Sequence, residues 1–330
     1  MQKVYLRADA GYGIGYGHFI RTLALADVLK DGFDCTFFTT QPTEYQLGEM
    51  AKVCKHVALK EETKFEDFFS CLNGDEIVVL DNYFYTTDYQ REIKAKGCRL
   101  VCIDDMHDKH YVADAVINHT PGTTEQQFSK EDFTRLFLGP EYLLIRRPFR
   151  EAIKNHTYYK DNQNIYICYG GSDEMNLTRK ACELILANNP RHIDAVVGGA
   201  YEFYDDLVEY AKDKDITVYR NISPEQIVSL LQESCLAVVP DSMVFFEACC
   251  LRRPTISGYD CDNQMFISQY NKKFHLGCEI GNLLEEYEEK FVKAYLGMTE
   301  EEADGYVHNQ DTIIRDSSNK LIEIFKKIKQ

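Results

Sequence analysis

The fold is decided by the stretch Val4-Tyr-Leu-Arg-Ala-Asp-Ala-Gly-Tyr-Gly-Ile-Gly-Tyr-Gly-His-Phe-Ile-Arg21. Residues 4–9 have the pattern of a strand, glycine recurs at every second position of the loop that follows, and helical spacing runs from about His18 to about Lys30. Glycine lets a ligand approach the backbone closely, and a helix start presents free N–H groups. The stretch therefore predicts a strand, a ligand-binding loop and a helix.

Short β-rich runs alternate with helical segments along the rest of the chain. Further strands are expected near residues 34–40, 77–81, 99–104, 115–118, 164–169, 193–197, 216–219, 236–239 and 254–257. Helices are expected near residues 177–187, 201–212, 224–232, 244–251 and 312–328. This alternation is typical of parallel sheets with crossover helices. We expect an α/β chain of two doubly wound, Rossmann-like domains facing a cleft: residues 1–150, which carry the glycine-rich loop and His18, and residues 151–330, which end in a helical tail.

Composition excludes several classes of protein. The 330 residues are 45% hydrophobic and 27% charged, which suits globular domains better than a disordered chain. The chain has 37 basic and 53 acidic residues, which gives a formal charge of −16. Because the chain is this acidic, we expect no nucleic acid partner and no stable membrane association. The 12 cysteines form no C-x-x-C pair, so we expect them to be reduced residues of the core. The N-terminus has no apolar signal core, which predicts a cytoplasmic protein.

The glycine-rich loop fits neither of the common nucleotide-binding motifs. His18 stands where a dinucleotide fingerprint has its third glycine, and no G-K-[ST] of a P-loop follows. What remains is a G-x-G-H-x-x-R pattern that ends at Arg21. A helix start disfavours the cation of an adjacent histidine, so His18 is expected to be a neutral base directed into the cleft. The structural alternative is a histidine that caps the helix or bonds a neighbouring loop.

Two further motifs of the first half follow predicted strands. Asp81-Asn-Tyr83 comes directly after the apolar run at 77–80, so its polar groups are expected at the same sheet edge as the glycine-rich loop, or else in an ordinary turn. The loop Asp104-Asp-Met-His-Asp-Lys-His110 contains two histidines and three carboxylates. Spacing on a loop fixes no ligand geometry, so a solvated or substrate-adjacent loop is expected there in preference to a metal site.

The second half offers two motifs that suit a nucleotide. Gly170-Gly-Ser-Asp173 lies between a predicted strand and a helix, where backbone N–H groups can hold a diphosphate. In Pro240-Asp-Ser-Met-Val-Phe-Phe-Glu247, Ser242 lies near a helix start, and Glu247 lies in an apolar helix where a carboxylate needs a partner. A carboxylate at that place can accept hydrogen bonds from both hydroxyls of a ribose.

Together these motifs resemble one family, the nucleotide-sugar hydrolases of pseudaminic acid biosynthesis, which release UDP from UDP-2,4-diacetamido-2,4,6-trideoxy-β-L-altropyranose. The matching pieces run in family order across residues 1–280. They are Gly15-x-Gly-His18-x-x-Arg21, Asp81-x-Tyr83, Asp104-Asp105, Gly139-Pro-Glu-Tyr-Leu-Leu-Ile-Arg146 with Phe149, Gly170-Gly-Ser-Asp173, Ser242 with Glu247, and Asn263-Gln264. The resemblance implies a GT-B fold, with the sugar in the cleft and UDP held mainly by the second domain. It also implies metal-independent hydrolysis at the anomeric carbon with inversion.

The resemblance implies roles for individual residues as well. His18 matches the general base for water, Tyr83 and Asn263 match groups that position the sugar or the water, and Glu247 matches the ribose ligand. Diphosphate contacts are implied at Gly171 and Ser172. The other substrate-binding residues expected from these motifs are Gly15, Gly17, Arg21, Asp81, Gly170, Asp173, Ser242 and Gln264. No cofactor and no metal are expected, the partners are a UDP-sugar and water, and the oligomeric state stays open.

Three alternatives share this fold or this ligand. A GT-B glycosyltransferase would pass the sugar of a UDP-sugar donor to a hydroxyl, and a membrane-bound acceptor would favour a basic, apolar face on the first domain. Residues 41–75 have no such face, because their lysines are mixed with acids. A non-catalytic nucleotide-sugar binding protein would need neither His18 nor a site for water. An epimerase that eliminates UDP would need catalytic carboxylates that are not evident.

Overall fold

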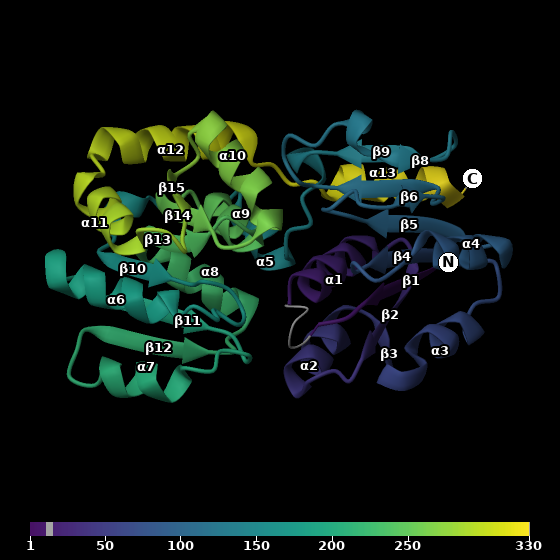
Figure 1. Ribbon diagram of the computed structural model, residues 1–330, viewed down its shortest axis with the longest axis horizontal. Helices are drawn as coiled ribbons and strands as arrows, with labels where there is room; N and C mark the ends of the chain where they lie inside the picture. Colours follow the sequence, from purple (N-terminus) through teal and green to yellow (C-terminus); the bar gives the residue numbers. More distant parts are fainter. Residues whose placement is uncertain (11–15, 330) are drawn as a thin grey trace. The chain divides into compact units, whose positions relative to one another are not determined.

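The computed structural model describes residues 1–10 and 16–329, which form two compact units (Figure 1). The first unit contains residues 1–147 together with the segment that begins at Asp316. The second unit contains residues 148–315. Each unit is built around one parallel β-sheet.

The described part of the first unit forms a seven-stranded sheet in the order β3-β2-β1-β4-β5-β7-β9, with neighbouring strands parallel. The strands are β1 (Lys3–Ala8), β2 (Asp34–Thr40), β3 (Lys55–Leu59), β4 (Ile77–Asp81), β5 (Arg99–Ile103), β7 (Ala115–Asn118) and β9 (Arg135–Leu138). A separate short ladder joins β6 (His110–Tyr111) and β8 (Ser129–Lys130). Because β1 pairs with both β2 and β4, the strand order reverses there. Ligands of such sheets bind outside the carboxyl ends of the strands at this reversal.

Helices cover both faces of this sheet. Leu6 of β1 packs with Leu25 of α1 on one face, and Leu80 of β4 packs with Phe68 of α3 on the other. Strands that are buried on both faces consist of nearly continuous apolar residues, as in Ile77-Val-Val-Leu80. The helices of this unit are α1 (Gly17–Leu29), α2 (Glu44–Val53), α3 (Lys64–Ser70), α4 (Thr87–Ala95) and α13 (Ser318–Lys329).

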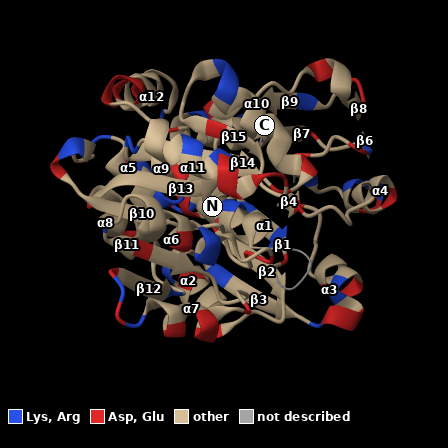
Figure 2. Cartoon of the chain, turned by 60° about the vertical axis from the view of Figure 1, so that its left-hand side comes forward, with Lys and Arg blue, Asp and Glu red and all other residues tan. Residues whose placement is uncertain are grey.

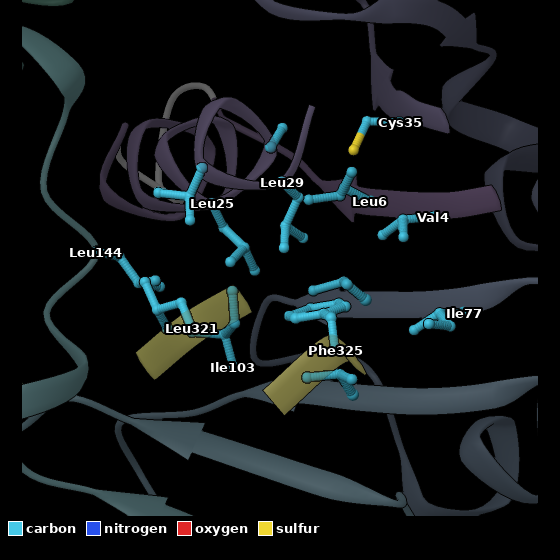
Figure 3. Packing of buried hydrophobic residues seen from close by; sticks show 14 of the residues in the cluster. Val4, Leu6, Leu25, Leu29, Cys35, Ile77, Ile103, Leu144, Leu321 and Phe325 are labelled. Atoms are coloured by element: carbon cyan, nitrogen blue, oxygen red, sulfur yellow. The ribbon is translucent and has the colours of Figure 1, made fainter. Parts of the chain in front are cut away.

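The last helix, α13, packs in the core of the first unit. Leu321 and Phe325 lie in one cluster with Val4 and Leu29, as Figure 3 shows. This differs from the expected assignment of residues 151–330 to a single second domain. The sequence shows that α13 is amphipathic but not which core it covers, because an apolar helix face fits any apolar surface.

The described part of the second unit forms a six-stranded parallel sheet in the order β12-β11-β10-β13-β14-β15. The strands are β10 (Asn164–Ile167), β11 (Ile193–Val197), β12 (Ile216–Arg220), β13 (Ser234–Pro240), β14 (Thr255–Tyr259) and β15 (Cys278–Asn282). Here β10 pairs with both β11 and β13, so the strand order reverses between the carboxyl ends of β10 and β13.

Helices cover both faces of the second sheet too. Ala181 of α6 and Phe291 of α11 share a cluster with Ile165 of β10. Tyr166 and Val239, which belong to the opposite face, are also buried, and α8 and α9 pack against β13. The helices of this unit are α6 (Leu177–Asn188), α7 (Tyr204–Ala211), α8 (Pro224–Gln232), α9 (Met243–Cys250), α10 (Met265–Phe274), α11 (Tyr287–Gly297) and α12 (Glu300–Ile313), and α5 (Arg147–Ala152) lies at the boundary between the units.

The expected class, an α/β chain of two doubly wound, Rossmann-like domains, is confirmed by these two sheets. Among the described strands, the sequence did not predict β3, β9 and β15, which lie at sheet edges, or β6 and β8, which form the separate short ladder. Four of the five residues of β3 are exposed, so this strand lacks the apolar run that marks a central strand.

Acidic residues are concentrated at the start of α12, as the colouring of Figure 2 shows, where residues 300–302 are three consecutive glutamates. This arrangement fits the formal charge of −16. Among the described residues, no helix combines the length and the apolar character that a bilayer span requires.

Candidate active site

The first candidate side chains stand on α1, which follows the carboxyl end of β1. His18 and Arg21 lie three residues apart, so they project from the same face of the helix, and each is only 5% exposed. A Cβ at Gly17 would meet no atom of the described residues within 4 Å. Gly15 belongs to the stretch 11–15, which lies outside the described residues.

Asp81, the last residue of β4, accepts hydrogen bonds from three side chains of α1. His18 Nδ1 lies 2.7 Å from Asp81 Oδ1, Arg21 donates to the two oxygens at 2.6 and 2.7 Å, and Thr22 Oγ1 donates at 2.7 Å. They meet because β4 is the neighbour of β1 in the sheet. Burial opposes the ionisation of Asp81, but the charge of Arg21 and the contact with His18 outweigh it and hold the pKa of Asp81 well below its usual range.

The contact with Asp81 fixes the tautomer of His18. An ionised carboxylate only accepts hydrogen bonds, so the proton between Nδ1 and Asp81 belongs to the imidazole. Arg21 Nη2 also lies 3.0 Å from Nδ1, but its shorter contact, 2.6 Å, is to Asp81. Nε2 therefore carries the lone pair of the neutral ring. His18 is built as a proton acceptor.

Arg21 is held between two carboxylates. Its Nη1 donates to Asp105 Oδ2 at 2.8 Å, while Nε and Nη2 hold Asp81. Burial opposes the charge of Arg21, but Asp105 and Asp81 outweigh it and raise its pKa; burial likewise opposes the ionisation of Asp105, and Arg21 outweighs it, so the pKa of Asp105 is lowered. The net formal charge of Arg21, Asp81 and Asp105 is −1. When His18 takes a proton, the group of four side chains becomes formally neutral.

Tyr83 completes this group. Its ring meets the ring of His18 edge to face, with centroids 4.6 Å apart, and its hydroxyl donates to Asp105 Oδ2 at 3.3 Å. A small pocket is lined by His18, Arg21, Asp81, Tyr83 and Asp105 together with neighbouring residues of the first unit. The structure thus brings four of the sequence-predicted site residues into one pocket.

A second buried ion pair anchors the strand end that leads into the glycine-rich loop. Asp9 pairs with Arg7, with one contact of 2.7 Å, and accepts a hydrogen bond from the backbone N–H of Thr40 at 2.8 Å. The backbone N–H of Asp9 donates to Asn82 Oδ1 at 2.8 Å. Because Asn82 follows Asp81, this network ties the loop entrance to the carboxylate that holds His18. Sequence reasoning missed Arg7 and Asp9, although a charged pair in an apolar strand is a signal for a buried partner.

His119 is a further polar residue near the pocket that the sequence analysis missed. It follows β7, is 3% exposed, and its Nδ1 has no hydrogen-bond partner among the described residues. Burial, and after it the positive charge of Arg21, lowers the pKa of His119 to about 4. His119 is therefore neutral at physiological pH. The sequence at residues 117–120 contains no motif that distinguishes this strand end from other strand ends, so it gives no sign of His119.

The loop at 104–110 is held by hydrogen bonds that Asp104 accepts. Asp104 accepts from Tyr111 Oη at 2.5 Å, from Asn118 Nδ2 at 3.3 Å and from the backbone N–H of His107 at 2.9 Å. In the part of the chain that the structure describes, no group of three or more acidic, histidine or cysteine side chains is placed to hold a metal. Of the two adjacent aspartates, Asp105 is the one that binds Arg21 in the pocket.

In the second unit, the loop after β10 runs close to the loop after β11, which begins at Gly198. Gly170 has φ +91°, a conformation that favours glycine, and a Cβ at Gly198 would lie 2.4 Å from the carbonyl oxygen of Gly171. Asp173 accepts hydrogen bonds from the backbone N–H groups of residues 177 and 178 at 2.8 Å each. Its carboxylate thus binds the start of α6, and the substrate contact expected from the motif stays a prediction.

The loop after β13 places a hydroxyl and a carboxylate on α9. Ser242 Oγ accepts a hydrogen bond from the backbone N–H of Val244 at 3.3 Å, which caps the helix, and Glu247 is 3% exposed. Asp241 turns inward, where its Oδ1 accepts from Ser257 Oγ at 2.7 Å and its Oδ2 is buried without a partner among the described residues. Burial, against the hydrogen bond from Ser257, raises the pKa of Asp241 to about 7.

The last sequence-predicted pair follows β14, which neighbours β13. Asn263 and Gln264 lie in a short 3₁₀ turn; Gln264 Oε1 accepts from the backbone N–H of Asp260 at 3.1 Å, and Asn263 is half-buried. The residues predicted for the nucleotide therefore follow three adjacent strands, β10, β13 and β14, at one edge of the second sheet. Their contacts with a ligand stay predictions.

The chain is similar to several known proteins, although no protein-family profile matches it. It is 27% identical to an uncharacterised protein of Methanocaldococcus jannaschii, over 79% of this chain and 56% of that protein. It is 25% identical to the spore coat polysaccharide biosynthesis protein SpsG of Bacillus subtilis, over 76% of this chain and 75% of that one. It is 26% identical to the UDP-2,4-diacetamido-2,4,6-trideoxy-β-L-altropyranose hydrolase of Campylobacter jejuni, over 76% and 89%. The last similarity confirms the resemblance that the motifs indicate.

Solved structures show the same fold over the whole chain. Acinetobacter baumannii MurG matches with a TM-score of 0.65 at 10% identity, over 99% of this chain and 100% of that one. Arabidopsis thaliana UGT89C1, solved with UDP-L-rhamnose, matches with a TM-score of 0.67 at 12% identity, over 99% of both chains. The expected GT-B-like fold is confirmed.

The buried carboxyl of Asp241 makes the stability of the second unit depend on pH. Its ordinary pKa is about 3.8 and the folded value is about 7, so between these values the native state binds more protons than the unfolded state. Stability therefore falls as pH rises through this range. Asp241→Asn removes the ionisation and keeps an oxygen for Ser257. We expect the stabilisation by this substitution to be larger at pH 8 than at pH 5 by about 2–3 kcal/mol, measured by urea unfolding.

A matched control is Asp213→Asn, which replaces an exposed aspartate whose φ of +58° asparagine also tolerates. It should leave the pH dependence unchanged. Equal effects of Asp241→Asn at the two pH values would show that Asp241 is ionised in the folded protein at pH 5 and would contradict the assignment.

Proposed function

We propose that the protein is a nucleotide-sugar hydrolase that releases UDP from a UDP-diacetamido-trideoxy-hexose by attack of water at the anomeric carbon, with inversion. The observation that carries the proposal is the 2.7 Å contact between His18 Nδ1 and Asp81, which leaves Nε2 as a proton acceptor on a pocket-lining side chain. Similarity to the Campylobacter hydrolase supports the choice of substrate.

The pocket of the first unit suits the activation of water. The water oxygen would bond to the anomeric carbon, the bond from that carbon to the β-phosphate oxygen would break, and UDP would leave with the electron pair of that bond. The proton of the water would pass to His18 Nε2. As the imidazolium forms, Nδ1–H keeps its hydrogen bond to Asp81, whose negative charge stabilises the cation. Because Arg21 and Thr22 already hold Asp81, little reorganisation is needed.

The second unit would hold UDP. The backbone at Gly171 and Ser172 follows β10, and α9 begins after Ser242, so N–H groups are available for the diphosphate at this sheet edge. Glu247, buried in α9, would accept hydrogen bonds from the ribose hydroxyls. Tyr83 and Asn263 would position the sugar or the water.

A glycosyltransferase is the second candidate, because solved structures with this fold include one with a bound UDP-sugar. In that case His18 would take the proton of an acceptor hydroxyl in place of water. A panel of UDP-sugars, assayed for UDP release with and without sugar acceptors, separates the two. Release without an acceptor supports the hydrolase, and release that requires an acceptor supports the transferase. Binding without release would show a binding protein.

His18→Asn tests the proposed base. The asparagine keeps some hydrogen-bonding capacity but cannot take the proton, so kcat for UDP release should fall by at least about a hundredfold. UDP affinity should stay within about threefold, because the proposal assigns UDP to the second unit. The measurements are steady-state UDP release and calorimetric titration with UDP.

His110→Asn is the matched control, because His110 bonds Ser129 Oγ at 2.8 Å outside the pocket. It should leave kcat unchanged. A His18→Asn protein that retains more than about a tenth of the wild-type kcat would refute the base role, since a positioned base contributes far more than that.

Glu247→Ala tests the ribose contact. Losing hydrogen bonds to a charged group costs about 1.5–3 kcal/mol, so UDP affinity should fall roughly ten- to a hundredfold in calorimetry. Glu209→Ala, which removes an exposed glutamate of α7, should leave it unchanged. Unchanged UDP affinity in a Glu247→Ala protein that keeps its unfolding temperature would remove Glu247 from the site.

A further inference from the structure

Asp105 has one carboxylate oxygen that the protein does not use. Its Oδ2 accepts from Arg21 at 2.8 Å and from Tyr83 at 3.3 Å. Its Oδ1 is buried and has no hydrogen-bond partner among the described residues. The residue as a whole is 8% exposed and lines the same pocket as His18.

This free oxygen can only accept. Arg21 keeps the carboxylate ionised, as the lowered pKa shows, and an ionised carboxylate has no proton to donate. A buried acceptor without a partner is costly, so the complete site is expected to bring a donor to it. No described side chain donates to this oxygen: Lys109 bonds the carbonyl oxygen of Tyr83 at 3.0 Å and pairs with Asp108 at 3.2 Å, and the neutral ring of His119, which still has one N–H, makes no hydrogen bond to it.

The position of the oxygen is fixed. Arg21 holds Asp105 on one side and Asp81 on the other, and Asp81 is itself held by His18 and Thr22. An acceptor that is fixed in this way loses little conformational entropy on binding, and it discriminates strongly against a ligand that lacks the donor.

We propose that Asp105 is a specificity-determining residue, whose free oxygen accepts a hydrogen bond from an N–H or O–H group of the glycosyl part of the substrate, close to the anomeric carbon. The inference rests on the proposed function of this pocket. It assigns to the first unit a contact that UDP alone cannot make.

The test measures binding without turnover, in the His18→Asn protein. Asp105→Asn is added to it, because the amide oxygen can still accept from Arg21 while its NH2 group takes the place of the free acceptor. The affinity for UDP-2,4-diacetamido-2,4,6-trideoxy-β-L-altropyranose should fall about ten- to a hundredfold in calorimetry, and the affinity for UDP should change by less than about twofold. Asp108→Asn, a 51% exposed neighbour in the same loop, should change neither affinity.

Analogues of the sugar identify the donor. Acetoxy groups in place of the acetamido groups remove N–H with little change of size, and fluorine in place of the hydroxyl removes O–H. One of these analogues should bind the Asp105-containing protein about tenfold less tightly and should lose nothing further in Asp105→Asn. If Asp105→Asn does not fold, the analogues in the Asp105-containing protein still test the inference, because equal binding of all of them would overturn it.

Three results would overturn the inference. The first is that all analogues bind as tightly as the parent sugar. The second is that Asp105→Asn lowers the affinity for UDP as much as the affinity for the UDP-sugar. The third is that Asp105→Asn, in the otherwise wild-type protein, lowers kcat and leaves the affinity for the UDP-sugar unchanged, which would mean that Asp105 positions the water. Failure of the proposed function is a different result: the wild-type protein would release UDP from none of the UDP-sugars.

Discussion

The site of the first unit depends on one buried cation, the guanidinium of Arg21 between Asp81 and Asp105. Without it, two carboxylates at neighbouring strand ends would repel each other in a medium that disfavours charge. With it, both stay ionised. Ionised Asp81 sets the tautomer of His18, and ionised Asp105 keeps one oxygen for a donor from outside. The proposed base and the proposed sugar contact therefore lie at the two ends of one chain of ion pairs.

The topology explains why these residues meet although they are far apart in sequence. Arg21 lies on the helix after β1, Asp81 ends β4, and Asp105 follows β5, and these three strands are consecutive in the sheet. The second unit repeats the arrangement with β10, β13 and β14. In both sheets the polar residues gather where parallel strands end, because the interior of each sheet is filled by apolar side chains that face helices on both sides.

Local patterns in the sequence predicted much of this. The glycine-rich loop before His18, the Asp81-Asn-Tyr83 turn and the two motifs of the second unit each combine a strand end with polar residues, so their place at a sheet edge could be predicted. Contacts between residues far apart in the sequence could not be predicted. The hydrogen bond from Arg21 to Asp105 joins residues 84 apart, and no periodic pattern in the sequence indicates it. Edge strands such as β3 and the core contact of α13 were missed for the same reason: their assignment depends on neighbours and not on local pattern.

The central claim is that Asp81 holds the His18 imidazole with its proton on Nδ1 and its lone pair on Nε2. The direct measurement is nitrogen-15 NMR of the histidine ring in the wild-type protein under conditions where the ring is neutral, with the His18 signals identified by their loss in His18→Asn. The account predicts a protonated Nδ1 and an unprotonated Nε2. A protonated Nε2, with Nδ1 accepting from Arg21 instead, would contradict it.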